Sequence, residues 1–171
     1  MSQPRPSPVA VESGESSPGE FSQPERALLL RLAHDSIVSA LQPSEVPGEE
    51  PGKARREIPL EAPTAHLAEP RGVFTTLYLR GELRGCVGYV LPVSSLYCAV
   101  AETARAAAFE DTRFYPVTPE EAPHLEIELS VLSVPQPIPA EAVEIGRHGL
   151  LISAGGRRGL LLPQVPLEHH W

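Results

Sequence analysis

The stretch GVFTTLYLRGELRGCVGYV, from Gly72 to Val90, decides the fold of this chain. The side chains of residues 73–80 alternate between two faces with the period of a strand. Gly81-Glu82 provides a turn, and residues 83–90 form the return strand. The stretch therefore predicts an antiparallel hairpin with Cys86 midway along its second strand.

Helices and further strands are expected on either side of this hairpin. Ser22 and Glu25 have the spacing of a capping box, which predicts a helix that Pro43 closes. The other expected elements are an alanine-rich helix from Ser94 or Ser95 to about Phe109, a strand over residues 125–134, and a second hairpin over residues 150–162. This order predicts an α+β fold in which helices flank an antiparallel sheet.

Two segments are rich in proline. Residues 1–20 contain, apart from Met1, only Val9, Ala10 and Val11 as apolar side chains, which predicts a disordered tail. Residues 43–70 hold six prolines and form a long loop, with a short helical turn expected near its end, from Thr64 to Ala68. The folded domain is therefore expected to cover residues 22–171.

The composition argues against several classes of function. A net charge of −8 is unfavourable for nonspecific binding to nucleic acid, which needs clustered Lys and Arg side chains. No apolar run is long enough to span a bilayer, and the first residues lack a signal-peptide pattern. We therefore expect a cytoplasmic protein whose two cysteines are reduced thiols.

No cofactor is indicated, and the metal-ligating side chains lack the spacing of a metal site. Two cysteines do not make a zinc site alone, and the histidines do not show the spacing of a zinc helix. The one alternative is a site assembled in space from Cys86, His148 and a carboxylate.

Cys86 is the leading candidate for a functional residue. A guanidinium group beside a thiol favours the reactive thiolate, and Arg84 would share the face of Cys86 on a regular strand. Gly85 and Gly88 would allow a close approach of the backbone to a ligand. We therefore expect Arg84, Gly85 and Gly88 to contribute to ligand binding, with Arg84 contacting an anion.

Three roles are open to the Cys86 thiol. As a catalytic nucleophile it would need a base, for which His148 is the candidate. It could instead bind a ligand or a partner without chemistry of its own. Free cysteines are also among the most buried residue types, so packing on a core strand is the third role. Whether the protein is an enzyme is left open.

Asp111 and Arg113 form a second candidate group, in the short connector that follows the alanine-rich helix. A charged pair in such a connector can clamp a loop or hold a ligand anion. A structural salt bridge is the alternative. We count both side chains among the candidates for ligand binding.

Six blocks of the sequence, taken together, resemble the AMMECR domain. The blocks are residues 72–77, residues 83–88 (LRGCVG), residues 106–114, residues 126–132, residues 146–150 and residues 159–165. The resemblance runs from about residue 22 to the end of the chain. The family's motif usually has Ile at the position of Val87.

The resemblance implies an α+β fold with a larger and a smaller part and a cleft between them. Bacterial and archaeal members resemble the A component of the AmmeMemoRadiSam system, which implies a Memo-type and a radical-SAM protein as partners. The motif around Cys86 is then the expected functional site, although no established reaction comes with the family. Members usually continue past the tryptophan into a C-terminal helix, so we expect this helix to be missing and the chain to be truncated.

Overall fold

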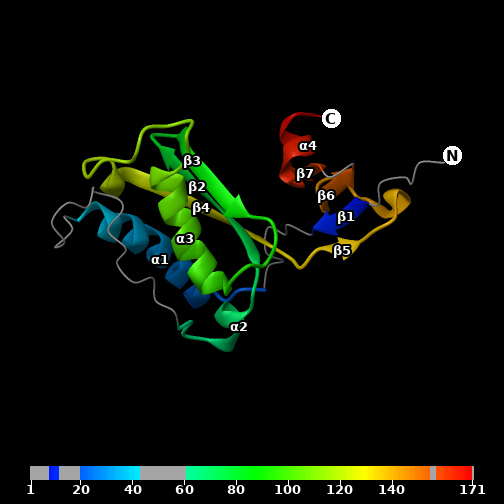
Figure 1. The fold of residues 1–171 in the computed structure, drawn as a ribbon, viewed down its shortest axis with the longest axis horizontal. Coiled ribbons are helices and arrows are strands. Elements are labelled where there is room, and N and C mark those ends of the chain that lie inside the picture. Colours follow the sequence, from blue (N-terminus) through cyan, green and yellow to red (C-terminus); the bar gives the residue numbers. More distant parts are fainter. Residues whose placement is uncertain (1–7, 12–19, 43–60, 155–156, 171) are drawn as a thin grey trace.

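The computed structural model describes residues 8–11, 20–42, 61–154 and 157–170, which form two lobes (Figure 1). The larger lobe contains a three-stranded antiparallel sheet, and the smaller lobe contains a four-stranded antiparallel sheet. The elements of the larger lobe are α1 (Gln23–Leu41), α2 (Ala65–Ala68), β2 (Gly72–Leu79), β3 (Glu82–Tyr89), α3 (Leu96–Phe109), the 3-10 helix η1 (Ala122–His124) and β4 (Leu125–Leu132). The α+β fold predicted from the sequence is confirmed.

The turn of the central hairpin lies one residue earlier in the chain than expected. Its turn is Arg80-Gly81 rather than Gly81-Glu82, because both residues adopt positive φ angles, 55° for Arg80 and 81° for Gly81. Two successive positive φ angles are the geometry of a tight hairpin turn that matches the twist of the strands. The strand order is β3-β2-β4, so β3 is an edge strand.

A bulge interrupts the pairing of β3 with β2. Leu77 pairs with Gly85, whereas the next residue, Tyr78, pairs with Leu83, which leaves Arg84 without a partner across the strands. Arg84 therefore lies outside the regular alternation on which its expected common face with Cys86 depends. An extra residue in one strand redirects the side chains around it.

One face of the three-stranded sheet is covered by α1 and α3 (Figure 1). The capping box at Ser22 and Glu25 starts α1 as predicted, with the Ser22 N–H donating to a Glu25 carboxylate oxygen over 3.0 Å. Its buried stripe includes Leu29, Ala33 and Ile37, whereas Leu30 is exposed. A buried hydrogen bond of 2.8 Å between the Thr75 and Thr103 hydroxyl groups joins β2 to α3.

The approach of α3 to β3 depends on Gly85. A Cβ atom at this position would lie 2.1 Å from the Ala107 carbonyl oxygen of α3. The small side chains of α3, among them Ala104, Ala107 and Ala108, are buried and let the helix backbone come this close. Gly85 therefore faces the helix, where Ala107 already fills the space beside it, and does not provide room for a ligand.

The smaller lobe has the strand order β5-β1-β6-β7. Its elements are β1 (Pro8–Val11), β5 (Gln136–Pro137), the 3-10 helix η2 (Ala140–Ala142), β6 (Gly149–Ala154), β7 (Arg157–Leu161) and α4 (Gln164–Glu168). The hairpin of β6 and β7 confirms the second predicted hairpin. The short helix α4 follows this hairpin and was not predicted from the sequence.

The prediction of a disordered tail over residues 1–20 is wrong at β1. Pro8–Val11 pairs with both β5 and β6. The reason is that the backbone groups of this segment complete the ladder between β5 and β6. Residues 1–7 and 12–19 lie outside the described residues, as do residues 43–60 of the proline-rich loop. The predicted helical turn at the end of that loop is α2, capped by the Thr64 side chain.

The structure also bears on membranes and metals, within its described residues. No helix there has the length and apolar character needed to cross a membrane. In the same part of the chain, no three His, Cys, Asp or Glu residues are grouped as a metal site would require.

The close packing at Gly85 leads to a prediction about stability. Gly85→Ala should lower the free energy of unfolding by about 2 kcal/mol, because the added methyl group meets a backbone oxygen that cannot move without displacing α3. Gly159→Ala is the matched control, since a Cβ atom on that strand glycine meets no described atom within 4 Å. Urea denaturation of both variants measures the effect, and equal stability would contradict the packing argument.

Candidate functional site

Cys86 lies in the middle of the edge strand β3, on the sheet face away from α1 and α3. Its neighbour Gly85 faces α3, and Val87 packs against the main core, so the Cys86 side chain points to the other side. The thiol is half-buried, and the Thr76 hydroxyl of β2 donates a hydrogen bond to its sulfur over 3.3 Å. Thr76 also pairs across the sheet with Glu128 of β4, so these three residues form one cross-strand row.

The backbone of Cys86 is held from the open edge of β3. An Asp111 carboxylate oxygen accepts the Cys86 N–H over 2.9 Å, and Arg113 donates from Nη2 to the Cys86 carbonyl oxygen over 3.4 Å. The two side chains also bind each other, with a closest N···O distance of 2.7 Å. The pair thus satisfies the donor and the acceptor that an edge strand leaves unpaired. In this structure Asp111 and Arg113 form a salt bridge that clamps the connector to β3.

The electrostatics of this clamp favour its charged form. Hydrogen bonds from the Arg113 side chain and then from the Cys86 N–H hold the pKa of Asp111 well below its ordinary value. The Asp111 carboxylate in turn raises the pKa of Arg113. Asp111 is only 8% exposed, whereas Arg113 is 58% exposed and presents its guanidinium group to solvent beside Cys86.

Arg84 binds the connector after α3. Its guanidinium group contacts the Glu121 carboxylate at 2.9 and 3.1 Å, and it donates to the Tyr115 carbonyl oxygen over 2.8 Å and to that of Pro116 over 3.3 Å. Arg84 therefore lowers the pKa of Glu121 through these hydrogen bonds. The result is a fixed connector on which the Tyr115 side chain is 90% exposed.

Gly88 also has a structural explanation. A Cβ atom there would lie 2.4 Å from the ring of Phe74, its cross-strand partner on β2. The aromatic ring thus covers the glycine on the same sheet face that carries Cys86. Neither glycine of the motif leaves an empty space beside it.

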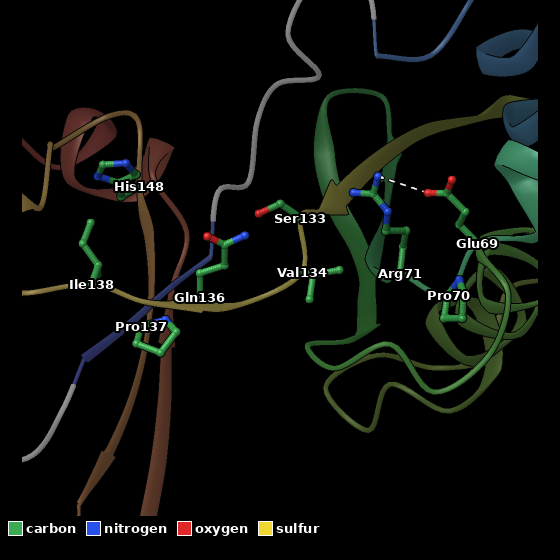
Figure 2. A pocket seen from close by; sticks show the side chains of 9 residues that line it. All are labelled: Glu69, Pro70, Arg71, Ser133, Val134, Gln136, Pro137, Ile138 and His148. Atoms are coloured by element: carbon green, nitrogen blue, oxygen red, sulfur yellow. Dashed lines mark hydrogen bonds and ion pairs between the residues drawn. The ribbon is translucent and has the colours of Figure 1, made fainter.

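His148 lies in a different place. It lines a cavity of about 610 Å³ where the two lobes meet (Figure 2). The cavity is lined by Glu69, Pro70, Arg71, Ser133, Val134, Gln136, Pro137, Ile138 and His148. The His148 Nδ1 atom accepts a hydrogen bond of 3.0 Å from the Glu144 N–H. Cys86 is not among the lining residues, so the structure does not bring the proposed base and nucleophile into one site.

The predicted candidates therefore fall into two groups. Arg84, Gly85, Gly88, Asp111 and Arg113 surround Cys86 or support it, while His148 belongs to the cavity. Sequence reasoning missed the other residues that shape both places, namely Thr76, Tyr115, Glu121 and the charged pair Glu69 and Arg71. The only sequence signal for that pair is its position directly before β2, around Pro70.

Comparisons with known proteins agree with this fold. A family model described as AMMECR1 matches residues 30–171. Protein MK0488 of Methanopyrus kandleri is 44% identical over 157 residues, covering 86% of this chain and 70% of its own length. A protein of Methanothermobacter thermautotrophicus is 38% identical over 158 residues, covering 88% of this chain and 77% of its own length. The crystal structure of the uncharacterised protein PH0010 from Pyrococcus horikoshii has 35% identity and a TM-score of 0.73, covering 89% of this chain and 75% of its own.

The Asp111 clamp predicts a specific pH dependence of stability. Because the folded-state pKa of Asp111 is lowered, its stabilising effect is complete above its ordinary pKa of about 3.9 and is lost as the pH falls towards the folded value. Asp111→Asn should cost about 2 kcal/mol at pH 7 and flatten the decline of stability below about pH 4. Asp35→Asn, at an exposed position of α1, is the control and should leave the profile unchanged.

The two cysteines should differ in accessibility. Iodoacetamide should alkylate the half-buried Cys86 at least about tenfold faster than the buried Cys98 of α3 in the folded protein. The difference should disappear in denaturant, which exposes both thiols. Peptide mass spectrometry after timed quenching gives both rates in one sample. Equal rates in the folded state would contradict the placement of Cys86.

Proposed function

Because this chain belongs to the AMMECR1 family, we propose that it is a component of an AmmeMemoRadiSam-type system. In this role it binds a small molecule, or a reactive group carried by a partner, on the sheet face around Cys86. The partners would be a Memo-type protein and a radical-SAM protein, as the family resemblance implies. The proposal assigns the protein to the cytoplasm, where reducing conditions keep Cys86 as a thiol.

One observation carries this proposal, which is that a half-buried thiol sits on a backbone held from two sides. Pairing with β2 holds Cys86 on one side, and the Asp111–Arg113 clamp holds it on the other. A functional group on a rigid strand with such supporting contacts keeps one geometry, which recognition and catalysis both require. The exposed guanidinium group of Arg113 beside it favours an anionic or polar group on the bound species.

A second function, a non-catalytic interaction module or scaffold, is favoured by Tyr115. This side chain is 90% exposed on a connector that Arg84 fixes through two carbonyl oxygens. Tyrosine is enriched among the residues that dominate binding energy at protein interfaces. In this reading the motif around Cys86 supports a docking surface for the Memo-type or radical-SAM partner, and the thiol itself is not needed.

Two measurements on purified proteins distinguish these functions. The first is the affinity of this chain for the Memo-type and radical-SAM proteins encoded in the same genome. The second is the rate of Cys86 alkylation with and without each partner. If the thiol face is the binding site, Cys86→Ser should weaken binding and a bound partner should slow alkylation by roughly tenfold. Cys98→Ser is the matched control and should bind like the unchanged protein.

The interaction-module function gives the opposite pattern. Tyr115→Ala should then weaken binding, while Cys86→Ser binds normally and the alkylation rate is unaffected by the partner. Loss of binding in neither variant, or no binding by the unchanged protein, would contradict both functions.

A further inference from the structure

The cavity between the lobes is separate from the Cys86 face, because Cys86 is not among the residues that line it. Its walls come from the segment before β2, from the connection between β4 and the smaller lobe, and from His148 of the smaller lobe (Figure 2). Its volume of about 610 Å³ lies in the range of small-molecule sites, which measure roughly 300–1,000 Å³. A ligand there would touch both lobes at once.

Charges of both signs lie side by side in one wall of this cavity. Arg71 is 15% exposed, and its Nη2 atom contacts the carboxylate of Glu20 at 2.7 Å and that of Glu69 at 3.5 Å. Among the described residues, both of these contacts use the same nitrogen, whereas a guanidinium group offers five N–H donors. Arg71 therefore keeps its Nε and Nη1 hydrogens as donors for a carboxylate.

Glu69 is suited to receive a positive group. Its side chain is 54% exposed, and its contact with Arg71 is at the outer limit of a hydrogen bond. The two carboxylates next to Arg71 make a purely anionic ligand unfavourable at this end. A purely cationic ligand would leave the remaining donors of Arg71 unused.

The rest of the cavity is suited to an uncharged, mostly apolar body. Pro70, Val134, Pro137 and Ile138 contribute apolar surface, with the polar side chains of Ser133 and Gln136 between them. This arrangement of many apolar contacts with a few polar groups is typical of sites that fix the orientation of a small ligand.

We propose that this cavity binds a small zwitterion of the amino-acid or short-peptide class, with its carboxylate on Arg71 and its ammonium group on Glu69. The adjacent opposite charges select a ligand that carries both groups close together. The apolar walls then contact its side chains. Because the ligand binds only the folded chain, in which both lobes form the cavity, binding also raises the resistance of the chain to heat.

Leucine and the dipeptide leucyl-leucine are suitable probes, together with their N-acetylated and C-amidated forms. Isothermal titration calorimetry and thermal unfolding of the full chain should show that at least one free zwitterion binds roughly tenfold more tightly than both of its blocked forms. The same zwitterion should raise the midpoint of thermal unfolding more than they do. Binding of no probe, or equal binding of free and blocked forms, would overturn the proposal.

Two substitutions test which charged side chain of the cavity binds which charged group of the ligand. Glu69→Gln should remove the preference for the free amine over the N-acetylated probe, while the preference for the free carboxylate persists. Arg71→Gln should remove the preference for the free carboxylate over the C-amidated probe, while the preference for the free amine persists. Arg31→Gln, at an exposed position of α1, is the control and should keep both preferences. Thermal unfolding without ligand shows whether each variant folds, and the proposal is wrong if a folded Glu69→Gln protein keeps the amine preference.

Discussion

The contact between Gly85 and Ala107 is the constraint on which the arrangement of the larger lobe depends. A strand that carried any side chain at Gly85 would keep α3 farther from the sheet. With α3 seated this closely, its C-terminal end delivers the connector to the open edge of β3, where Asp111 follows the helix almost at once. Local packing thus determines where the charged clamp can form, and a change in the helix position would move the clamp away from Cys86.

The connector after α3 has two structural roles: it covers the open edge of β3, and it presents Tyr115 to solvent. Through Asp111 and Arg113 it closes the edge of β3, which would otherwise offer unpaired backbone groups to other chains. Through its contacts with Arg84 it displays Tyr115. Four charged side chains, Arg84, Asp111, Arg113 and Glu121, therefore stabilise the same segment that supports both proposed binding surfaces. Their charge pairs are internal to the fold, which explains why an arginine in the motif does not itself have to meet a ligand.

Much of the fold could be predicted from the sequence because its signals are local. The capping box of α1, the alanine-rich helix α3 and the alternation in β4 each depend on residues near one another in the chain. The residues around Cys86 could be predicted from the sequence, but their contacts with one another could not. The bulge at Arg84 and the contact of Asp111 with the Cys86 backbone arise from pairing between distant segments. The cavity was missed for the same reason, since Arg71 and His148 line one cavity only after both lobes have formed.

The place of β1 in the smaller lobe has a consequence for the order of folding. Pro8 pairs with Ile152, and Val11 pairs with Gly149, so the first described strand needs partners from near the other end of the chain. During synthesis, the segment containing β1 leaves the ribosome long before β5 and β6 exist. The larger lobe, whose strands are closer in sequence, can form in the interval, and the smaller sheet closes last because contacts between distant residues form slowly. Until then the backbone groups of residues 8–11 lack the partners that β5 and β6 provide, so this segment is open to pairing with other chains.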